Sequence, residues 1–164
     1  FVLPARARTR LAMTIAVPRD TSDGSYHGKV SFKVFGTEAG ELLSETVVPI
    51  NVLVGTEHQR SLEVRSITTQ RVEDEGTYLS IDLLNNGNVA FLPQISAILS
   101  NEQGEFMERI LFELPGDEGI LPQQALHVAR LASILEPGSY DLELEVTHSG
   151  VEIAREEHRI VVSD

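Results

Sequence analysis

The chain has 164 residues, 41% of them apolar, which is enough for one ordinary domain or two small ones with a packed core. It carries 13 lysine and arginine residues against 25 aspartate and glutamate residues, and its formal net charge of −12 would repel the phosphate backbone of a nucleic acid. The absence of cysteine excludes disulfides and thiolate chemistry, and no apolar run approaches the roughly 18 residues of a membrane span. We therefore expect neither a nucleic-acid partner nor a transmembrane segment in this chain.

Apolar and polar residues alternate along most of the chain, a pattern typical of half-buried β-strands. The run from Leu11 to Val17 shows it first, and in GSYHGKVSFKV (24–34) one face is apolar while the other is polar and basic. The pattern returns in four more runs: Val48 to Val54, Leu79 to Leu83, Val89 to Leu99 and Tyr140 to Val146. No segment keeps a helical period, and the mixed run 123–135 is assigned to a strand. The sequence therefore predicts an all-β protein.

Turn-forming residues separate these runs. NNGN (85–88) and NEQGE (101–105) offer the Asn and Gly that tolerate positive φ, and they predict antiparallel hairpins. The polar stretch GTEHQR (55–60) separates two sets of strands, so we place a domain boundary there and divide the chain into 1–56 and 57–164. The second part has room for about seven short strands, the number of an immunoglobulin-like β-sandwich.

Two parts of the chain repeat one another. LPARARTRLAMTIAVPRDTSDGSY (3–26) and LPQQALHVARLASILEPGSY (121–140) each contain Leu-Pro, a mixed strand, a Pro and then Gly-Ser-Tyr before an alternating strand. The second copy lies deep inside its domain and the first at the N-terminus. We therefore expect 1–56 to be the C-terminal half of a sandwich, with three or four strands, whose N-terminal strands would lie upstream of Phe1.

A half-sandwich cannot bury its own apolar face. The face would have to be covered by the second domain, by another copy of the chain or by another polypeptide. If the cover comes from another chain, we expect a homo-oligomer or strand exchange through the incomplete first domain.

The element LEPGSYDLELEV (135–146) resembles the corner between strands E and F of fibronectin type III and related immunoglobulin-like modules. In that corner the hydroxyl of a Tyr bonds a nearby backbone group while its ring lies in the core. Tyr140 matches this position and Tyr26 is the parallel candidate in the first copy. The resemblance implies structural tyrosine corners at both.

A second resemblance covers more of the chain. VPRDTSDGSYHGKVSFKV followed by VVPINVLV resembles the end of the first, peptidoglycan-associated domain of the WxL-interacting cell-surface proteins of Gram-positive bacteria. LSIDLLNNGNVAFLPQISAIL, ILP and LEPGSYDLELEV resemble the second domain of that family, although the chain lacks the Trp common near its final strand. The resemblance implies two tandem immunoglobulin-like modules placed extracellularly, on the cell surface or in the periplasm.

Residues that could carry chemistry are dispersed. The five histidines form no pair with ligand spacing, and no nucleophile elbow or phosphate-binding loop is present. Asp20 and Asp23 in RDTSDG are oxygen donors of the kind calcium prefers, but the alternating spacing and terminal Glu of a calcium loop are missing. A turn capped by aspartate side chains is the favoured interpretation, with calcium as the alternative. We expect no catalytic residue, no cofactor and no metal.

These features favour a non-enzymatic interaction module that binds a protein or a cell-wall polymer. An accessory or spacer module of a larger surface protein or enzyme is one alternative. The other is a pilus-type chaperone that acts by strand complementation, for which Arg6, Arg8 and Arg10 supply the local basic cluster.

Overall fold

A computed structural model describes residues 8–36, 40–72, 75–114, 116, 119–132 and 135–163. These residues form strands and no helix, which confirms the all-β class. Consequently none of the described residues belongs to a helix long and apolar enough to cross a membrane. The strands are β1 (Gly24–Phe35), β2 (Leu42–Val54), β3 (Leu62–Val72), β4 (Gly76–Asn85), β5 (Gln94–Ser100), β6 (Phe106–Phe112), β7 (Ala125–Ala132), β8 (Gly138–His148) and β9 (Val151–Val162).

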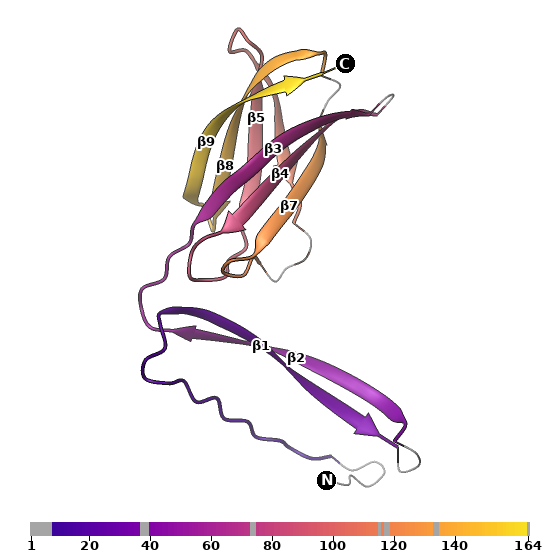
Figure 1. The fold of residues 1–164 in the computed structure, drawn as a ribbon, viewed down its shortest axis with the longest axis vertical. Helices are drawn as coiled ribbons and strands as arrows, with labels where there is room; N and C mark the ends of the chain where they lie inside the picture. The colour runs from indigo at the N-terminus through magenta and orange to yellow at the C-terminus, as the bar shows by residue number, and fades with distance from the viewer. Residues whose placement is uncertain are drawn as a thin grey trace.

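Strands β3 to β9 form two antiparallel sheets that face each other as a β-sandwich (Figure 1). One sheet has the order β3-β4-β7 and the other the order β6-β5-β8-β9. The hydrophobic core lies between them, and all its buried residues fall between Leu62 and Val162. The mixed run 123–135 contributes β7, as predicted, because β7 pairs along its length with β4.

Strand β8 shows why this sequence forms a two-layer structure. Tyr140, Leu142, Leu144 and Val146 are buried, while the acidic residues between them lie on the outer face of the sheet. Burial of each such apolar side chain contributes roughly 1.5–3 kcal/mol. A shift of the register by one residue would place these side chains in water, so the alternation fixes the register.

The segment between β4 and β5 crosses from one sheet to the other, so the prediction of a hairpin at NNGN is wrong. The reason is Asn85, which is fully buried and bonds the segment internally. Its side-chain N–H groups donate to the carbonyl oxygens of Val89 (3.0 Å) and Ile120 (2.9 Å), and its side-chain oxygen accepts from the N–H of Gly87 (3.0 Å). NEQGE does join a hairpin, between β5 and β6.

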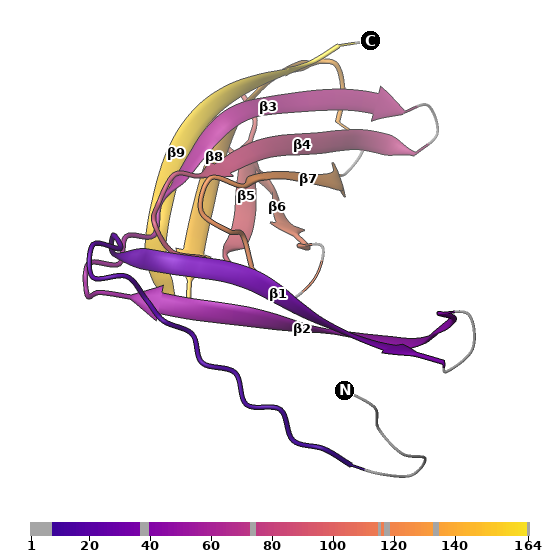
Figure 2. The same ribbon diagram turned by 60° about the horizontal axis from the view of Figure 1, so that its bottom comes forward.

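Strands β1 and β2 form a separate two-stranded sheet beyond one end of the sandwich (Figures 1 and 2). The expected strand from Leu11 to Val17 is absent, since residues 8–18 pair with no other strand. Alternation alone is insufficient for a strand, because the backbone N–H and C=O groups also need a neighbouring strand. Among the described residues of 1–56 there are thus two strands rather than three or four, and the tandem arrangement of two immunoglobulin-like units stays a prediction.

The β1–β2 hairpin repeats the geometry of the β8–β9 hairpin. Gly24 pairs with Val54 and Tyr26 with Val52, just as Gly138 pairs with Val162 and Tyr140 with Ile160. The Gly-Ser-Tyr repeat of the sequence is therefore also a repeat of strand pairing and register.

Both repeated tyrosines donate a hydrogen bond to a carbonyl oxygen four residues upstream. The hydroxyl of Tyr140 lies 2.7 Å from the oxygen of Glu136, and that of Tyr26 lies 3.0 Å from the oxygen of Ser22. Their surroundings differ, since the residue Tyr140 is 7% exposed and Tyr26 is 44% exposed. Only Tyr140 combines the hydrogen bond with a ring in the core.

We predict that Tyr140→Phe lowers the free energy of unfolding by about 1 kcal/mol, because it removes a half-buried hydrogen bond and leaves the ring in place. The matched change Tyr26→Phe removes the same bond from an exposed site and should cost less than about 0.5 kcal/mol. Urea denaturation followed by circular dichroism measures both. An equal or larger loss for Tyr26→Phe would contradict this difference.

Candidate functional site

The base of the hairpin is attached to the sandwich by a set of hydrogen bonds that we call the junction, formed by Asp23, Ser25, residues 56–59 and Asn88. One carboxylate oxygen of Asp23 accepts hydrogen bonds from the N–H groups of Thr56 (2.8 Å) and Glu57 (2.7 Å). Asp23 precedes β1 and Thr56 follows β2, so this carboxylate ties the two open ends of the hairpin together.

Asn88, in the segment fixed by Asn85, makes the connection to the sandwich. Its side-chain N–H groups donate to the carbonyl oxygens of Asp23 (3.1 Å) and Glu57 (2.8 Å), and its side-chain oxygen accepts from the N–H of Gln59 (2.7 Å). Its backbone N–H donates to the carbonyl of Gln59 (3.0 Å), and its backbone oxygen accepts from the N–H of Ser25 (2.9 Å). One residue thus bonds the chain before β1, the start of β1 and the chain after β2.

Two glycines make this close approach feasible. Gly55 has a φ of +72°, and a Cβ there would overlap the carboxylate of Asp23. A Cβ on Gly87 would overlap the backbone of Gln59 and Ser61. A side chain at Gly55 would displace the Asp23 carboxylate from the base of the hairpin, and one at Gly87 would push residues 59–61 away from the sandwich.

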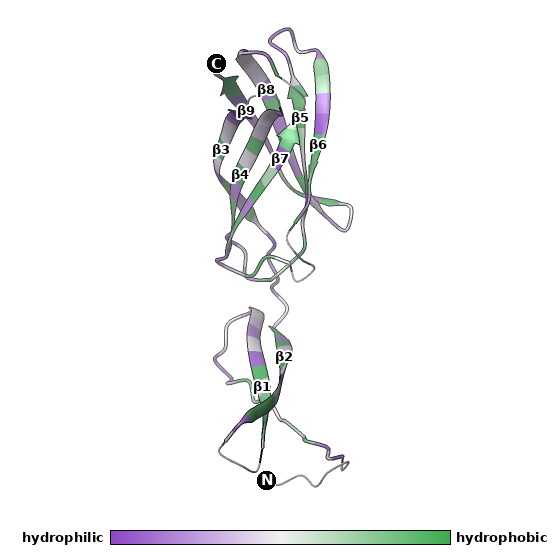
Figure 3. Ribbon diagram, turned by 90° about the vertical axis from the view of Figure 1, so that its right-hand side faces the viewer, coloured by the Kyte–Doolittle hydropathy of each residue, from purple (hydrophilic) through white to green (hydrophobic). Residues whose placement is uncertain are grey.

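Beyond the junction the hairpin has an uncovered apolar face. Within β1, Tyr26, Val30, Phe32 and Val34 lie on this face, joined on β2 by the cross-strand partners Val48, Ile50 and Val52. Phe32 is 39% exposed and Val34 is 53% exposed, whereas Val146, the residue of β8 that corresponds to Phe32, is buried. In Figure 3, hydrophobic residues (green) occur along β1 and β2 where the hairpin extends away from the sandwich. The hairpin therefore presents to solvent a surface of the kind that lines a core.

The opposite face of β1 is basic, although the whole chain is acidic. It carries His27, Lys29, Ser31 and Lys33. The ammonium of Lys33 lies 3.7 Å from the carboxylate of Glu45 on β2, whereas Lys29 forms no ion pair with any described residue. The opposite face of the hairpin is thus mixed, because β1 contributes basic side chains whereas β2 contributes the exposed Val47 and Leu53 and the acidic Glu45.

The two aspartates named for the calcium alternative lie in different surroundings. The Asp23 carboxylate is occupied by the two N–H groups of the junction, and Asp20 lies exposed in the preceding turn. Within the described ranges no group of three or more His, Asp or Glu side chains is placed to hold a metal ion. Of the basic cluster, Arg6 lies outside the described residues, while Arg8 and Arg10 are exposed in the segment before β1.

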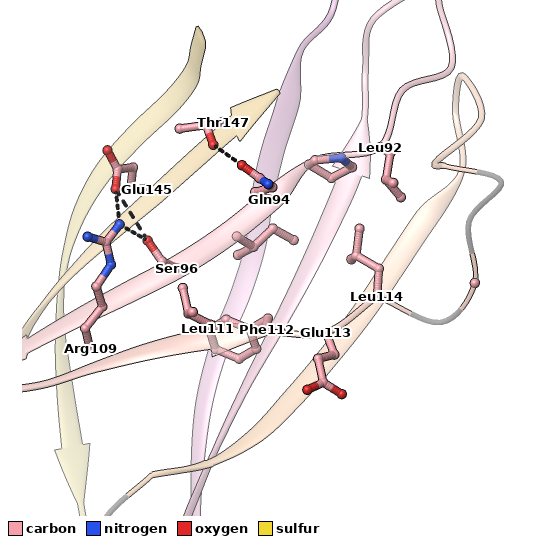
Figure 4. A pocket seen from close by; sticks show the side chains of 13 residues that line it. Leu92, Gln94, Ser96, Arg109, Leu111, Phe112, Glu113, Leu114, Glu145 and Thr147 are labelled. Atoms are coloured by element: carbon pink, nitrogen blue, oxygen red, sulfur yellow. Dashed lines mark hydrogen bonds and ion pairs between the residues drawn. The ribbon is translucent and has the colours of Figure 1, made fainter. Parts of the chain in front are cut away.

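A groove of about 730 Å³ lies on the outer face of β5 and β6 (Figure 4). Its apolar end includes Leu92, Leu111 and Leu114. At its polar end the guanidinium of Arg109 lies 2.8 Å from the carboxylate of Glu145 and 3.0 Å from the hydroxyl of Ser96. These two charges therefore already neutralise each other.

Comparison with known proteins finds no family model that matches the chain and no curated protein that is significantly similar to it. The resemblances to fibronectin type III modules and to WxL-interacting proteins therefore stay predictions. Sequence reasoning missed the junction because Asp23 and Asn88 are 65 residues apart and each lies in a motif typical of ordinary turns.

The Asp23 carboxylate makes the junction sensitive to acid. Hydrogen bonds from the N–H groups of Glu57 and Thr56 hold the pKa of Asp23 below its ordinary value of 3.8, with a smaller contribution from the charge of His58. Because the pKa is depressed in the folded chain, the stabilisation is fully present above pH 3.8 and is lost as the pH falls through the folded pKa.

We predict that the amide resonances of Thr56 and Glu57 titrate together with a midpoint below 3.8, as measured by NMR over an acid pH series. Asp23→Asn should abolish this transition, because the amide side chain does not ionise. A midpoint at or above 3.8 would contradict the assignment of the junction to an ionised Asp23.

Proposed function

We propose that this chain is a non-catalytic, extracytoplasmic immunoglobulin-like interaction module that binds a protein partner through the β1–β2 hairpin. The observation that carries the proposal is the apolar face of the hairpin, exposed at Tyr26, Phe32 and Val34, which the junction presents beyond the end of the sandwich. The placement on the cell surface, outside the cell or in the periplasm rests on the resemblance to bacterial surface modules.

Physical arguments support the hairpin as the binding element. An isolated two-stranded hairpin is marginally stable in water, and exposed contiguous apolar surface commonly marks an interaction site. A partner that covered this face would supply the second layer that β8 and β9 obtain from β3, β4 and β7. A protein suits the face better than a polysaccharide, because Tyr26 and Phe32 are its only aromatic residues within β1 and β2 up to Val34 and the chain has no Trp for stacking on sugars.

The junction favours one second candidate, an accessory or spacer module in a larger surface protein. Asn88 fixes the direction in which the hairpin leaves the sandwich, as a spacer between neighbouring domains requires. In that case the hairpin face would be covered within the same assembly, and the chain would bind no separate protein.

The test is retention of extracytoplasmic bacterial proteins and of purified cell wall by the immobilised chain, compared with its Phe32→Glu variant. We expect a protein to be retained and Phe32→Glu to reduce its retention at least tenfold, because a buried unpaired charge opposes association. Val151→Glu is the matched control, since Val151 is an exposed apolar residue (64%) on β9, and it should leave retention unchanged.

Retention of cell wall alone would contradict the choice of a protein partner. Equal loss with both variants, or with neither, would contradict the choice of the hairpin as the binding element.

A further inference from the structure

The two edges of the hairpin differ in their ability to accept another strand. The N–H of Ser25 points away from β2, because it donates to the carbonyl of Asn88. Since bonding direction alternates along an antiparallel strand, His27, Lys29, Ser31 and Lys33 also direct their backbone N–H and C=O groups to the outer edge of β1. The edge is thus occupied by the sandwich at Ser25 and open beyond it.

The outer edge of β2 is blocked. Lys29 pairs with Pro49, so Pro49 occupies a position on β2 whose backbone nitrogen faces outward. A proline there removes a donor from the outer edge without disturbing the pairing with β1, and prolines of this kind discourage further pairing. The described part of β1 contains no proline. The outer edge of β1 is therefore the edge to which a strand can add.

The molecule itself contains a template for that addition. The β1–β2 hairpin matches the β8–β9 hairpin in register, and β8 carries β5 on its other side. Strand β5 runs antiparallel to β8 and spans Asp141 to Thr147. Transferred through the shared register, this places a new strand opposite residues 27 to 33 of β1.

The side chains of β1 define what that strand must carry. Between residues 27 and 33, three β1 positions lie on the apolar face, and one of them is Gly28. A Cβ at Gly28 would meet no other atom within 4 Å, so a large side chain opposite it has room. On the other face, and among the residues that the structure describes, Lys29 forms no ion pair and Lys33 pairs with Glu45 alone. Opposite charges directly across an antiparallel pair are favourable, whereas like charges are unfavourable.

We propose that the outer edge of β1, from His27 to Lys33, binds an extended segment of a partner protein as an antiparallel strand. That segment has apolar residues opposite Gly28, Val30 and Phe32, and carboxylates opposite Lys29 and Lys33. This inference rests on the proposed function and specifies its partner by edge, direction and charge. The backbone bonds supply the attachment and the alternating side chains the selectivity, as in other cases of strand addition.

The test uses the peptide EISAELS, which is β5 (QISAILS) with glutamate at the positions opposite Lys33 and Lys29. It is titrated into the full isotope-labelled chain and followed by NMR. We expect the amide resonances of His27, Lys29, Ser31 and Lys33 to shift, because their N–H groups gain carbonyl acceptors. The peptide KISAKLS should bind at least about tenfold more weakly, since it opposes like charges at two positions.

Proline substitutions at two directly paired positions of the hairpin give matched variants. Ser31 pairs with Val47, and both direct their N–H groups outward, toward opposite edges. Ser31→Pro should abolish peptide binding, and Val47→Pro should leave it unchanged. Retained cross-strand contacts between β1 and β2 in the NMR spectra of both variants would show that the hairpin stays folded.

The proposal would be overturned by unshifted β1 amides at millimolar peptide, by equal binding of KISAKLS, or by binding that Ser31→Pro leaves intact. The retention experiment separates this failure from that of the proposed function. Loss of the retained protein with Phe32→Glu but not with Ser31→Pro would leave the hairpin face as the binding element and refute the edge.

Discussion

The hydrogen bonds of Asn88 hold the β1–β2 hairpin against the sandwich, and the interactions proposed for the hairpin depend on this attachment. They join a hairpin with no core of its own to a sandwich that holds the whole buried core of the described chain. The sandwich in turn fixes Asn88, because the buried Asn85 bonds the segment between β4 and β5 from within. The core thus holds the buried Asn85, Asn85 orders the segment that contains the half-buried Asn88, and Asn88 holds the base of the hairpin.

The junction secures only the first residues of β1, and among the described residues the hairpin beyond it has no third strand on its edge. The pairing of β8 with β5 and the layer formed by β3, β4 and β7 show what such a hairpin needs: a strand on its edge and a sheet on its face. The same physical requirements, unmade backbone hydrogen bonds and uncovered apolar surface, underlie both the proposed binding face and the proposed binding edge.

Alternating residues predicted the all-β class, and the Gly-Ser-Tyr repeat predicted two equivalent strands, because both signals are local. The segment from Leu11 to Val17 alternates equally well and forms no strand, since pairing depends on a neighbour that its own sequence does not specify. The same limit applies at NNGN, where burial of Asn85 turned an expected hairpin into a crossover. Asp23 was noted for its carboxylate, but its acceptance of hydrogen bonds from Thr56 and Glu57 depends on the folded path of the chain.

Hydrogen exchange of the β1 amides in the isolated chain tests most directly whether a folded hairpin offers an open edge. Gly28, Val30 and Phe32 should be protected by pairing with β2, whereas His27, Lys29, Ser31 and Lys33 should exchange rapidly. Protection of both sets would show that another strand already occupies the edge. Rapid exchange of both sets would show that the hairpin does not form, and either result would contradict the structure on which the proposed interaction depends.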